Sequence, residues 1–217
     1  MDQIKKLYID LKKKYGEPRG QWLLWCKRPK TERDKEEIAI GSILTQRTNW
    51  KNVEKAIENL KTAEVLSFSS IYRLGNQNIN SIEELIRSSG FYKQKAVRLF
   101  KFCEFIIKNY NSLKSFLKQD VEIAQRELLS LSGIGPETAD SILLYAGEKP
   151  VFVIDEYSKR LIKKQKLTCD YSYHSLQKLF EKNLVSDYRL YQDFHALIVI
   201  DGKKKSAYNK TNDKRFI

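Results

Sequence analysis

Apolar residues recur along most of the chain with the three- and four-residue spacing of amphipathic helices. At the amino terminus, this spacing places Ile4, Leu7, Tyr8 and Leu11 on one face, and Gly16 follows where a left-handed helix end is expected. The same pattern predicts further helices over residues 34–46, 49–61, 81–90, 92–110, 123–133, 136–147, 155–165, 173–185 and 188–202. Because helical patterns dominate, the sequence predicts an all-α fold.

Residues 150–155 break the pattern. They are apolar and β-branched, but the run is short and no second strand is available to pair with it. We expect an extended, buried connector that leads into the next helix. The strongest charged runs are residues 31–37 and 202–215, and the second is expected to form a loosely ordered tail.

The charge of the chain points to a polyanionic partner. Lys and Arg number 40 against 27 Asp and Glu, which gives a net charge of +13. Such a charge attracts nucleic acid and speeds encounter with it, although a basic solubility surface would have the same composition. No apolar stretch is long enough to cross a bilayer, and the first residues lack the apolar core of a signal peptide. We therefore expect a cytoplasmic, nucleoid-associated monomer with no membrane partner.

The cysteines and histidines do not indicate a metal or disulfide framework. Cys26, Cys103 and Cys169 are odd in number and widely separated, so we expect reduced packing residues. His174 and His195 lie in ordinary helical patterns, where structural roles are more common than metal binding.

One short stretch is suited to binding a phosphate. Residues 131–147 read LSGIGPETADSILLYAG, which predicts a helix, a tight glycine turn and a second helix that begins at Pro136. The N–H groups of Gly133, Ile134 and Gly135 would face an anion, reinforced by the positive end of the following helix. An ordinary helix–helix connection that needs glycine only for steric reasons fits the same letters.

Three segments together carry a family resemblance: residues 38–57 (IAIGSILTQRTNWKNVEKAI), 128–146 (LLSLSGIGPETADSILLYA) and 151–161 (VFVIDEYSKRL). In this order and spacing they resemble the helix-hairpin-helix DNA glycosylase superfamily, in its endonuclease III-like branch, over roughly residues 30–205. The resemblance implies two helical lobes with an active-site cleft between them. One lobe would comprise residues 28–149 and end in the hairpin at about 124–146, and the other residues 1–27 plus 150–217.

The resemblance also implies an activity. Members of the family bind a phosphate of double-stranded DNA through the hairpin, extrude a damaged nucleotide and cleave its N-glycosidic bond. Asp155 resembles the family's essential aspartate: an ionised carboxylate there would stabilise the positive charge that develops on the sugar and orient the attacking water. The same residue also suits a helix N-cap, and both roles are compatible.

Two departures from the family pattern narrow the chemistry. Relatives that also cleave the DNA backbone carry a lysine nucleophile at the hairpin position that Glu137 occupies here. A carboxylate cannot form a Schiff base, so the resemblance implies a monofunctional enzyme. Many relatives also hold an iron–sulfur cluster through four cysteines, whereas this sequence has Ser206 where the first is expected. We therefore expect no cluster and no required cofactor.

The expected substrate pocket contains Trp22, Trp25, Trp50 and Glu137. The tryptophans match aromatic positions of the family's 3-methyladenine glycosylases, and stacking with cation–π attraction suits an alkylated purine. Core packing is the competing interpretation for these large side chains.

The remaining expected DNA contacts lie in three segments. By resemblance, Gln46 would fill the gap left by the extruded nucleotide, and Phe91 would wedge into the opposite strand. Phosphate contacts are expected from Lys93, Lys95 and Arg98, and from the basic carboxyl-terminal segment that includes Lys203 and Lys205. In relatives the hairpin holds a monovalent cation, Na⁺ or K⁺, through backbone carbonyls that match Leu129, Leu131 and Ile134.

These expectations combine into one functional hypothesis. The chain would excise an alkylated purine such as 3-methyladenine and leave an abasic site, as part of base excision repair. The alternatives are a glycosylase for oxidised or mismatched bases, and a non-catalytic DNA-binding protein that has kept the hairpin.

Overall fold

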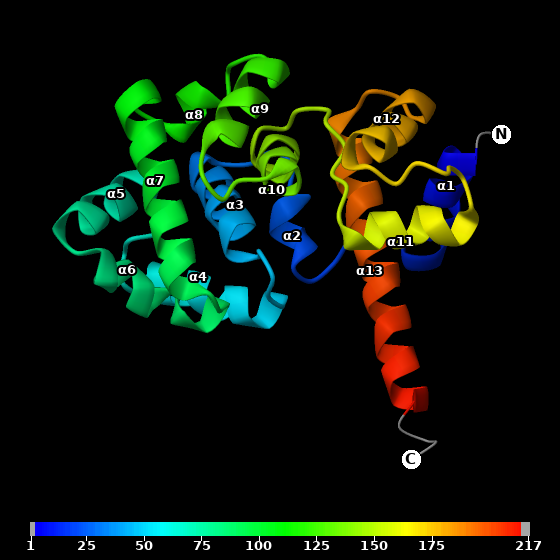
Figure 1. Ribbon diagram of the computed structural model, residues 1–217, viewed down its shortest axis with the longest axis horizontal. Helices are drawn as coiled ribbons and strands as arrows, with labels where there is room; N and C mark the ends of the chain where they lie inside the picture. Colours follow the sequence, from blue (N-terminus) through cyan, green and yellow to red (C-terminus); the bar gives the residue numbers. More distant parts are fainter. Residues whose placement is uncertain (1–2, 214–217) are drawn as a thin grey trace. The chain divides into compact units, whose positions relative to one another are not determined.

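The computed structural model describes the backbone of residues 3–213 and the side chains of residues 3–204, and within this range the protein is helical without strands (Figure 1). No helix in the described range has both the length and the apolar character needed to cross a membrane. The all-α prediction is confirmed. The α-helices are α1 (Gln3–Tyr15), α2 (Trp22–Trp25), α3 (Glu32–Leu44), α4 (Trp50–Thr62), α5 (Phe68–Gln77), α6 (Ile79–Leu85), α7 (Tyr92–Tyr110), α8 (Leu113–Phe116), α9 (Val121–Ser130), α10 (Pro136–Ser141), α11 (Glu156–Gln165), α12 (Tyr173–Asn183) and α13 (Tyr188–Asp213).

The helices form two compact units. The central unit is Lys27–Lys149, and the terminal unit joins Met1–Cys26 to Pro150–Ile217. The boundaries inferred from the sequence lay one residue away at the first junction and coincide at the second.

The central unit is built around two buried helices. The long helix α7 packs against α5 and α6, and α3 packs against α4, α7 and the segment that follows α10 (Figure 1). From Ile38 to Leu44 every residue of α3 is buried, because neighbours cover this half of the helix on all sides. Phe68 of α5 meets Phe102 of α7 edge to face, with ring centroids 5.0 Å apart.

The amino-terminal end of α3 differs from the prediction. The periodic pattern predicts a helix from residue 34, but α3 begins at Glu32 and Thr31 is the N-cap. Thr31 Oγ1 accepts from the Asp34 N–H, and Asp34 Oδ2 accepts from the Thr31 N–H at 2.7 Å. This reciprocal capping box satisfies two of the N–H groups that a helix start leaves without intrahelical partners.

The helix-hairpin-helix is formed as predicted. Helix α9 ends at Ser130, residues 131–135 make the turn, and α10 begins with Pro136 in its first turn. The predicted single helix over 136–147 changes to π geometry over Ile142–Ala146 (η2), where the Gly147 N–H donates to the Ile142 carbonyl at 2.9 Å. All five η2 residues are buried, and η2 packs against α3.

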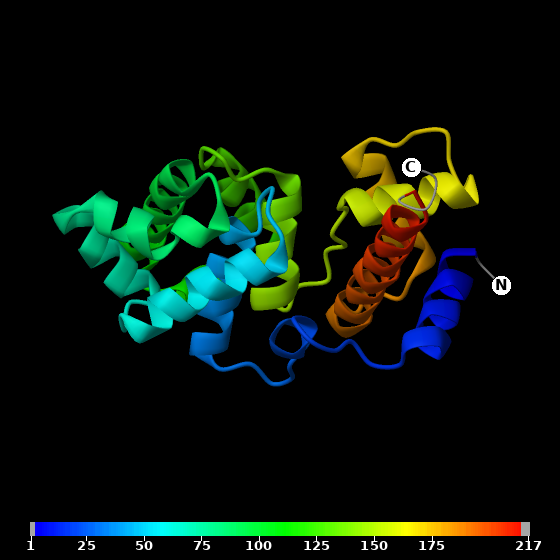
Figure 2. The ribbon, with the colours of Figure 1, turned by 90° about the horizontal axis from the view of Figure 1, so that it is seen from below.

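In the terminal unit α13 packs against α1 and α11 (Figure 2). Residues 151–155 form the predicted extended connector, buried along its whole length. Phe152 in this connector stacks on Phe180 of α12, with ring centroids 4.1 Å apart, and meets Phe194 and Tyr191 of α13 edge to face. The aromatic cluster therefore holds the connector whose last residue is Asp155.

We predict that Phe152→Ala destabilises the terminal unit by about 3–5 kcal/mol, because it removes a fully buried ring and leaves a cavity. Val185→Ala serves as the control: Val185 belongs to the same unit but is 71% exposed, so its change should be near zero. Urea unfolding of both variants tests this, and a small effect of Phe152→Ala would show that the connector is not held by its aromatic contacts.

Candidate functional site

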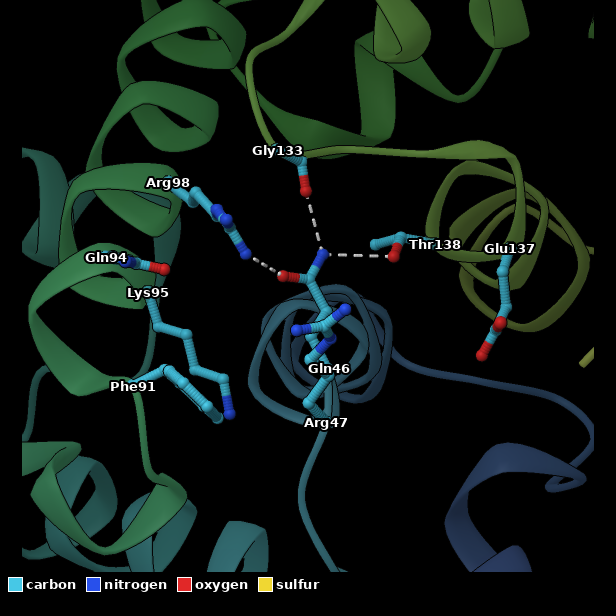
Figure 3. A pocket seen from close by; sticks show the side chains of 9 residues that line it. All are labelled: Gln46, Arg47, Phe91, Gln94, Lys95, Arg98, Gly133, Glu137 and Thr138. Carbon is cyan, nitrogen blue, oxygen red and sulfur yellow. Dashed lines mark hydrogen bonds between the residues drawn. The ribbon is translucent and has the colours of Figure 1, made fainter. Parts of the chain in front are cut away.

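A pocket of about 320 Å³ opens in the central unit beside the hairpin. Three segments meet there: the end of α3 and the residues after it, the first turns of α7, and the glycine turn with the start of α10 (Figure 3). The lining side chains are mainly polar or basic, and they are Gln46, Arg47, Phe91, Gln94, Lys95, Arg98, Gly133, Glu137 and Thr138.

Gln46 connects the three segments of the pocket. Its Nε2 donates to the Gly133 carbonyl at 2.9 Å and to Thr138 Oγ1 at 3.1 Å (Figure 3). Its Oε1 accepts from Arg98 Nη1 at 2.7 Å. Sequence reasoning identified Gln46 as a DNA-inserting residue but not this network, because its partners lie 87, 92 and 52 positions away. Insertion into DNA stays a prediction, and it would require Gln46 to exchange these bonds.

The two hairpin glycines differ in whether the fold requires them. Gly133 has φ +84°, and a Cβ there would lie 2.2 Å from the Arg98 side chain, so both backbone and packing require glycine. Gly135 has φ −93° and ψ 177°, which any residue adopts, and a Cβ there would meet no atom within 4 Å. The fold therefore does not itself require glycine at 135, where the backbone is open to a ligand.

The hairpin amides are not all available to an anion. The Ile134 N–H donates to the Leu131 carbonyl at 3.0 Å and the residue is 4% exposed, so its predicted phosphate contact is corrected. Within the described residues, the N–H groups of Gly133 and Gly135 donate to no protein acceptor, and both residues are exposed. Gly135 is also the N-cap of α10, where the positive end of the helix favours an anion.

Phe91 is an exposed aromatic residue held in an unusual conformation. It is 59% exposed, and its φ of 47° lies in the left-handed region that residues other than glycine enter only at a cost of about 1–2 kcal/mol. Strain of this kind gathers at functional sites. Lys93, in the first turn of α7, is exposed as a phosphate contact requires. The DNA contacts of both residues stay predictions.

Lys95 is buried, which corrects its predicted phosphate contact. Its side chain is 1% exposed, and Nζ donates to the carbonyls of Leu44 at 2.7 Å and Ser89 at 2.6 Å. Burial, with a smaller contribution from the Arg98 guanidinium, lowers the pKa of Lys95 to about 8. The ammonium thus donates hydrogen bonds to two backbone carbonyls inside the protein.

The terminal unit holds Asp155 at the N-cap of α11. Its Oδ1 accepts from the Ser158 N–H at 2.8 Å, and its Oδ2 lies 3.6 Å from His195 Nε2 of α13. The Asp155 side chain is 13% exposed. Burial alone would raise the pKa of Asp155, but His195 and the Ser158 amide outweigh it, so the pKa is lowered from the ordinary 3.8. The carboxyl group is therefore ionised at neutral pH.

His195 is a neighbour of Asp155 that sequence reasoning treated as structural. It is 5% exposed, and its ring meets Trp22 edge to face at 5.8 Å between centroids and Phe152 at 6.5 Å. Trp22 in turn meets Trp25 edge to face at 5.9 Å. The only signal in the sequence was a polar aromatic residue inside the apolar run of residues 194–200.

The predicted pocket tryptophans fall in both units. Trp22 and Trp25 of the terminal unit are 5% and 7% exposed, so packing accounts for most of their surface. Trp50 begins α4 in the central unit and is partly exposed. Trp22 meets His195, the neighbour of Asp155. A base-stacking role stays a prediction for all three tryptophans.

The basic carboxyl-terminal segment begins near Asp155. Loss of hydration lowers the pKa of Lys203, an effect that the nearby Asp155 carboxylate opposes, and Lys203 Nζ donates to Gln21 Oε1 at 2.8 Å. Lys205 belongs to α13, but its side chain lies outside the described residues. Glu137 lies exposed in the first turn of α10 and lines the pocket of the central unit.

Comparison with known sequences relates the chain to DNA repair proteins. A sequence model described as "HhH-GPD superfamily base excision DNA repair protein" matches residues 40–185. A Methanocaldococcus jannaschii protein provisionally named a DNA repair glycosylase is 44% identical over 171 residues, which cover 77% of this chain and 76% of that protein. Endonuclease III of Thermotoga maritima is 30% identical over 130 residues, which cover 60% of this chain and 56% of that protein.

Comparison with solved structures agrees. The crystal structure of the H. pylori 3-methyladenine DNA glycosylase bound to 1,N6-ethenoadenine matches with a TM-score of 0.76 and 30% identity, covering 94% of this chain and 99% of that one. A non-covalent endonuclease III–DNA complex matches with a TM-score of 0.70 at 19% identity, over 91% and 83% of the two chains, and shows the fold alone. The resemblance inferred from the sequence is confirmed.

We predict that substitution destabilises the central unit at Gly133 but not at Gly135. Gly133→Ala should lower the free energy of unfolding of the central unit by about 2 kcal/mol, from the left-handed backbone and the Arg98 contact. Gly135→Ser should not lower it, because serine suits an extended N-cap and its Cβ enters open space. Thermal unfolding of both variants measures this, and equal losses would refute the distinction.

We also predict that His195→Phe raises the pKa of Asp155, because burial remains while the imidazole is lost. In the unsubstituted protein the folded-state pKa lies below the ordinary 3.8, so ionised Asp155 stabilises the fold above that pH, and the contribution is lost as the pH falls through the folded value. A carbon-13 NMR titration of the Asp155 carboxyl compares the two proteins. An unchanged pKa would exclude His195 as the cause.

Proposed function

Because the chain belongs to the HhH-GPD superfamily of base excision DNA repair proteins, we propose that it is a monofunctional DNA glycosylase that removes an alkylated purine from double-stranded DNA. The observation that carries the proposal is Asp155, a nearly buried carboxylate kept ionised at a helix N-cap by His195 and the Ser158 amide. A packing role alone would not require a charge at this position, and the N-cap role, which favours one, is compatible with catalysis.

A carboxylate in this state suits cleavage of an N-glycosidic bond. As the bond breaks, positive charge grows on the sugar, and a fixed negative charge stabilises that charge more strongly than bulk water does. The ionised group can also orient the attacking water and accept its proton. Because Oδ1 is held by the Ser158 amide, the direction of the carboxylate is set before the substrate arrives.

The hairpin is the proposed site of phosphate binding. The amides of Gly133 and Gly135 are exposed, and the second lies at the positive end of α10. A glycine that the fold does not require at 135 leaves room for a phosphate to approach the backbone closely. The net charge of +13 would attract double-stranded DNA to this surface. The carbonyls of Leu129, Leu131 and Ile134 remain the proposed ligands of a monovalent cation beside it.

We propose that the enzyme leaves the abasic strand intact. The hairpin position where relatives with lyase activity carry a lysine is Glu137, which has no amine with which to form a Schiff base. Lys95, the lysine of the central unit whose lowered pKa would make it a better nucleophile, is buried with its ammonium on two carbonyls. A covalent DNA adduct is therefore not expected.

The preference for an alkylated purine rests on similarity and on chemistry. The similar H. pylori protein is a 3-methyladenine DNA glycosylase, matched over nearly the full length of both chains. The partly exposed Trp50 is the candidate for stacking on a cationic purine, which gains cation–π attraction. Stacking on Trp22 or Trp25, which are 5% and 7% exposed, would require a change in their packing. Such a base is also a good leaving group, so an ionised carboxylate without a separate general acid would suffice.

We predict that the protein releases 3-methyladenine from alkylated duplex DNA, and that Asp155→Asn lowers the release rate by at least about 10³-fold, the scale expected when charge stabilisation at the reacting centre is lost. Affinity for an abasic-analogue duplex should change less than about threefold, since the amide keeps the shape of the N-cap. Chromatography of the released base and a filter-binding titration give the two quantities.

Two results would contradict this proposal. Retained turnover in Asp155→Asn would remove the carboxylate from the mechanism, and a borohydride-trapped protein–DNA adduct would show lyase chemistry. Glu156→Gln is the matched control, because Glu156 is the exposed neighbouring acid in the first turn of α11 and its loss should leave the rate unchanged.

A further inference from the structure

Lys95 joins two loops that are far apart in the sequence. Its Nζ donates to the carbonyl of Leu44, the last residue of α3, at 2.7 Å. It also donates to the carbonyl of Ser89, the last residue of the short 3-10 helix η1 (Arg87–Ser89), at 2.6 Å. Helices α4, α5 and α6 lie between these carbonyls along the chain. Lys95 itself is 1% exposed, and Ser89 is fully buried.

The two carbonyls have equivalent positions relative to the expected DNA-inserting side chains. Gln46 follows Leu44 by two residues, and Phe91 follows Ser89 by two residues. Each loop then contains a residue in the left-handed region, Arg47 with φ 52° and Phe91 with φ 47°. Figure 3 shows the Lys95 side chain beside Phe91 in the pocket that Gln46 also lines.

A buried ammonium is well suited to hold such loops. Carbonyls at a helix end lack intrahelical partners, and a cation at the negative end of α3 interacts favourably with the helix dipole. Hydrogen bonds from a charged donor are stronger than neutral ones, and they strengthen further in a medium of low polarity. Burying the charge is costly, as the lowered pKa of Lys95 shows, so its retention at this position calls for a reason beyond packing.

We propose that Lys95 is a positioning residue, which sets the separation of the Gln46 and Phe91 loops so that both side chains can enter a DNA duplex at one step. The proposal rests on the proposed function, since it concerns how the same surface engages DNA. Lys95 touches no DNA in this account. It acts through the two loops, and the strain at Phe91 is maintained because the Ser89 carbonyl is tied down.

The first experiment needs no DNA. Hydrogen exchange of the full chain is compared between the unsubstituted protein and Lys95→Met, which keeps the length of the side chain but removes its donors. Exchange should quicken about tenfold at residues 44–47 and 89–92 together, the factor expected from losing a charge-assisted hydrogen bond. The control is Leu99→Ala, a cavity one turn along α7 at a fully buried position whose side chain has no hydrogen-bond donor, and it should not quicken the two loops together.

The second experiment measures discrimination by DNA binding. The ratio of affinities for a duplex with a tetrahydrofuran abasic analogue and an intact duplex should fall about tenfold in Lys95→Met and stay unchanged in Leu99→Ala, at a temperature well below both melting points. Affinity for intact duplex, which depends on backbone contacts, should be retained in both.

The outcomes separate the inference from the function. Unchanged exchange in Lys95→Met, quickening of a single loop, or equal effects of Leu99→Ala would overturn the positioning role. So would quickened exchange with discrimination retained. If the unsubstituted protein shows no preference for the abasic analogue, the DNA role of Lys95 fails, whereas the exchange result still shows whether Lys95 holds the loops. Failure of the proposed function is seen separately, as absence of 3-methyladenine release.

Discussion

The central unit depends on one side chain that satisfies three partners at once. The amide of Gln46 donates to the Gly133 carbonyl and to Thr138, and it accepts from Arg98. Gly133 must adopt a positive φ with no Cβ for the Arg98 side chain to lie over it. These requirements join the end of α3, the first turns of α7 and the hairpin into one surface. Lys95 makes a second connection between α3 and α7, because its ammonium donates to the carbonyls of Leu44 and Ser89.

The terminal unit keeps a carboxylate charged at a place that little water reaches. Burial would favour the protonated form of Asp155, but His195 and the Ser158 amide favour the ionised form and prevail. The aromatic cluster around Phe152 anchors the connector, and the N-cap position directs the side chain. The proposed chemistry uses both properties, a fixed direction and a retained charge, because a charge already in place stabilises a developing cation on a sugar without reorganisation during the reaction.

Much of this arrangement was predictable from local patterns. The apolar period defined α7, the glycine turn and Pro136 defined the hairpin, and a run of β-branched residues ending in Asp155 defined the connector and its cap. Helix α5 was missed because its Ser, Gly, Asn and Gln residues weaken the periodic pattern, and packing of Phe68 and Ile71 stabilises it instead. Lys95 was assigned to the surface by its residue type, and His195 to a structural role. Leu44 lies 51 residues from Lys95 and Asp155 lies 40 residues from His195, and no local signal carries such contacts.

Whether the hairpin amides hold one particular phosphate is measured directly as the affinity for a set of duplexes that each carry a single neutral methylphosphonate. A large loss of affinity is expected at one position on the damaged strand, with small losses at the other positions. An affinity that falls equally wherever the charge is removed would show that binding depends only on the total charge of the DNA, and that the hairpin amides bind no particular phosphate.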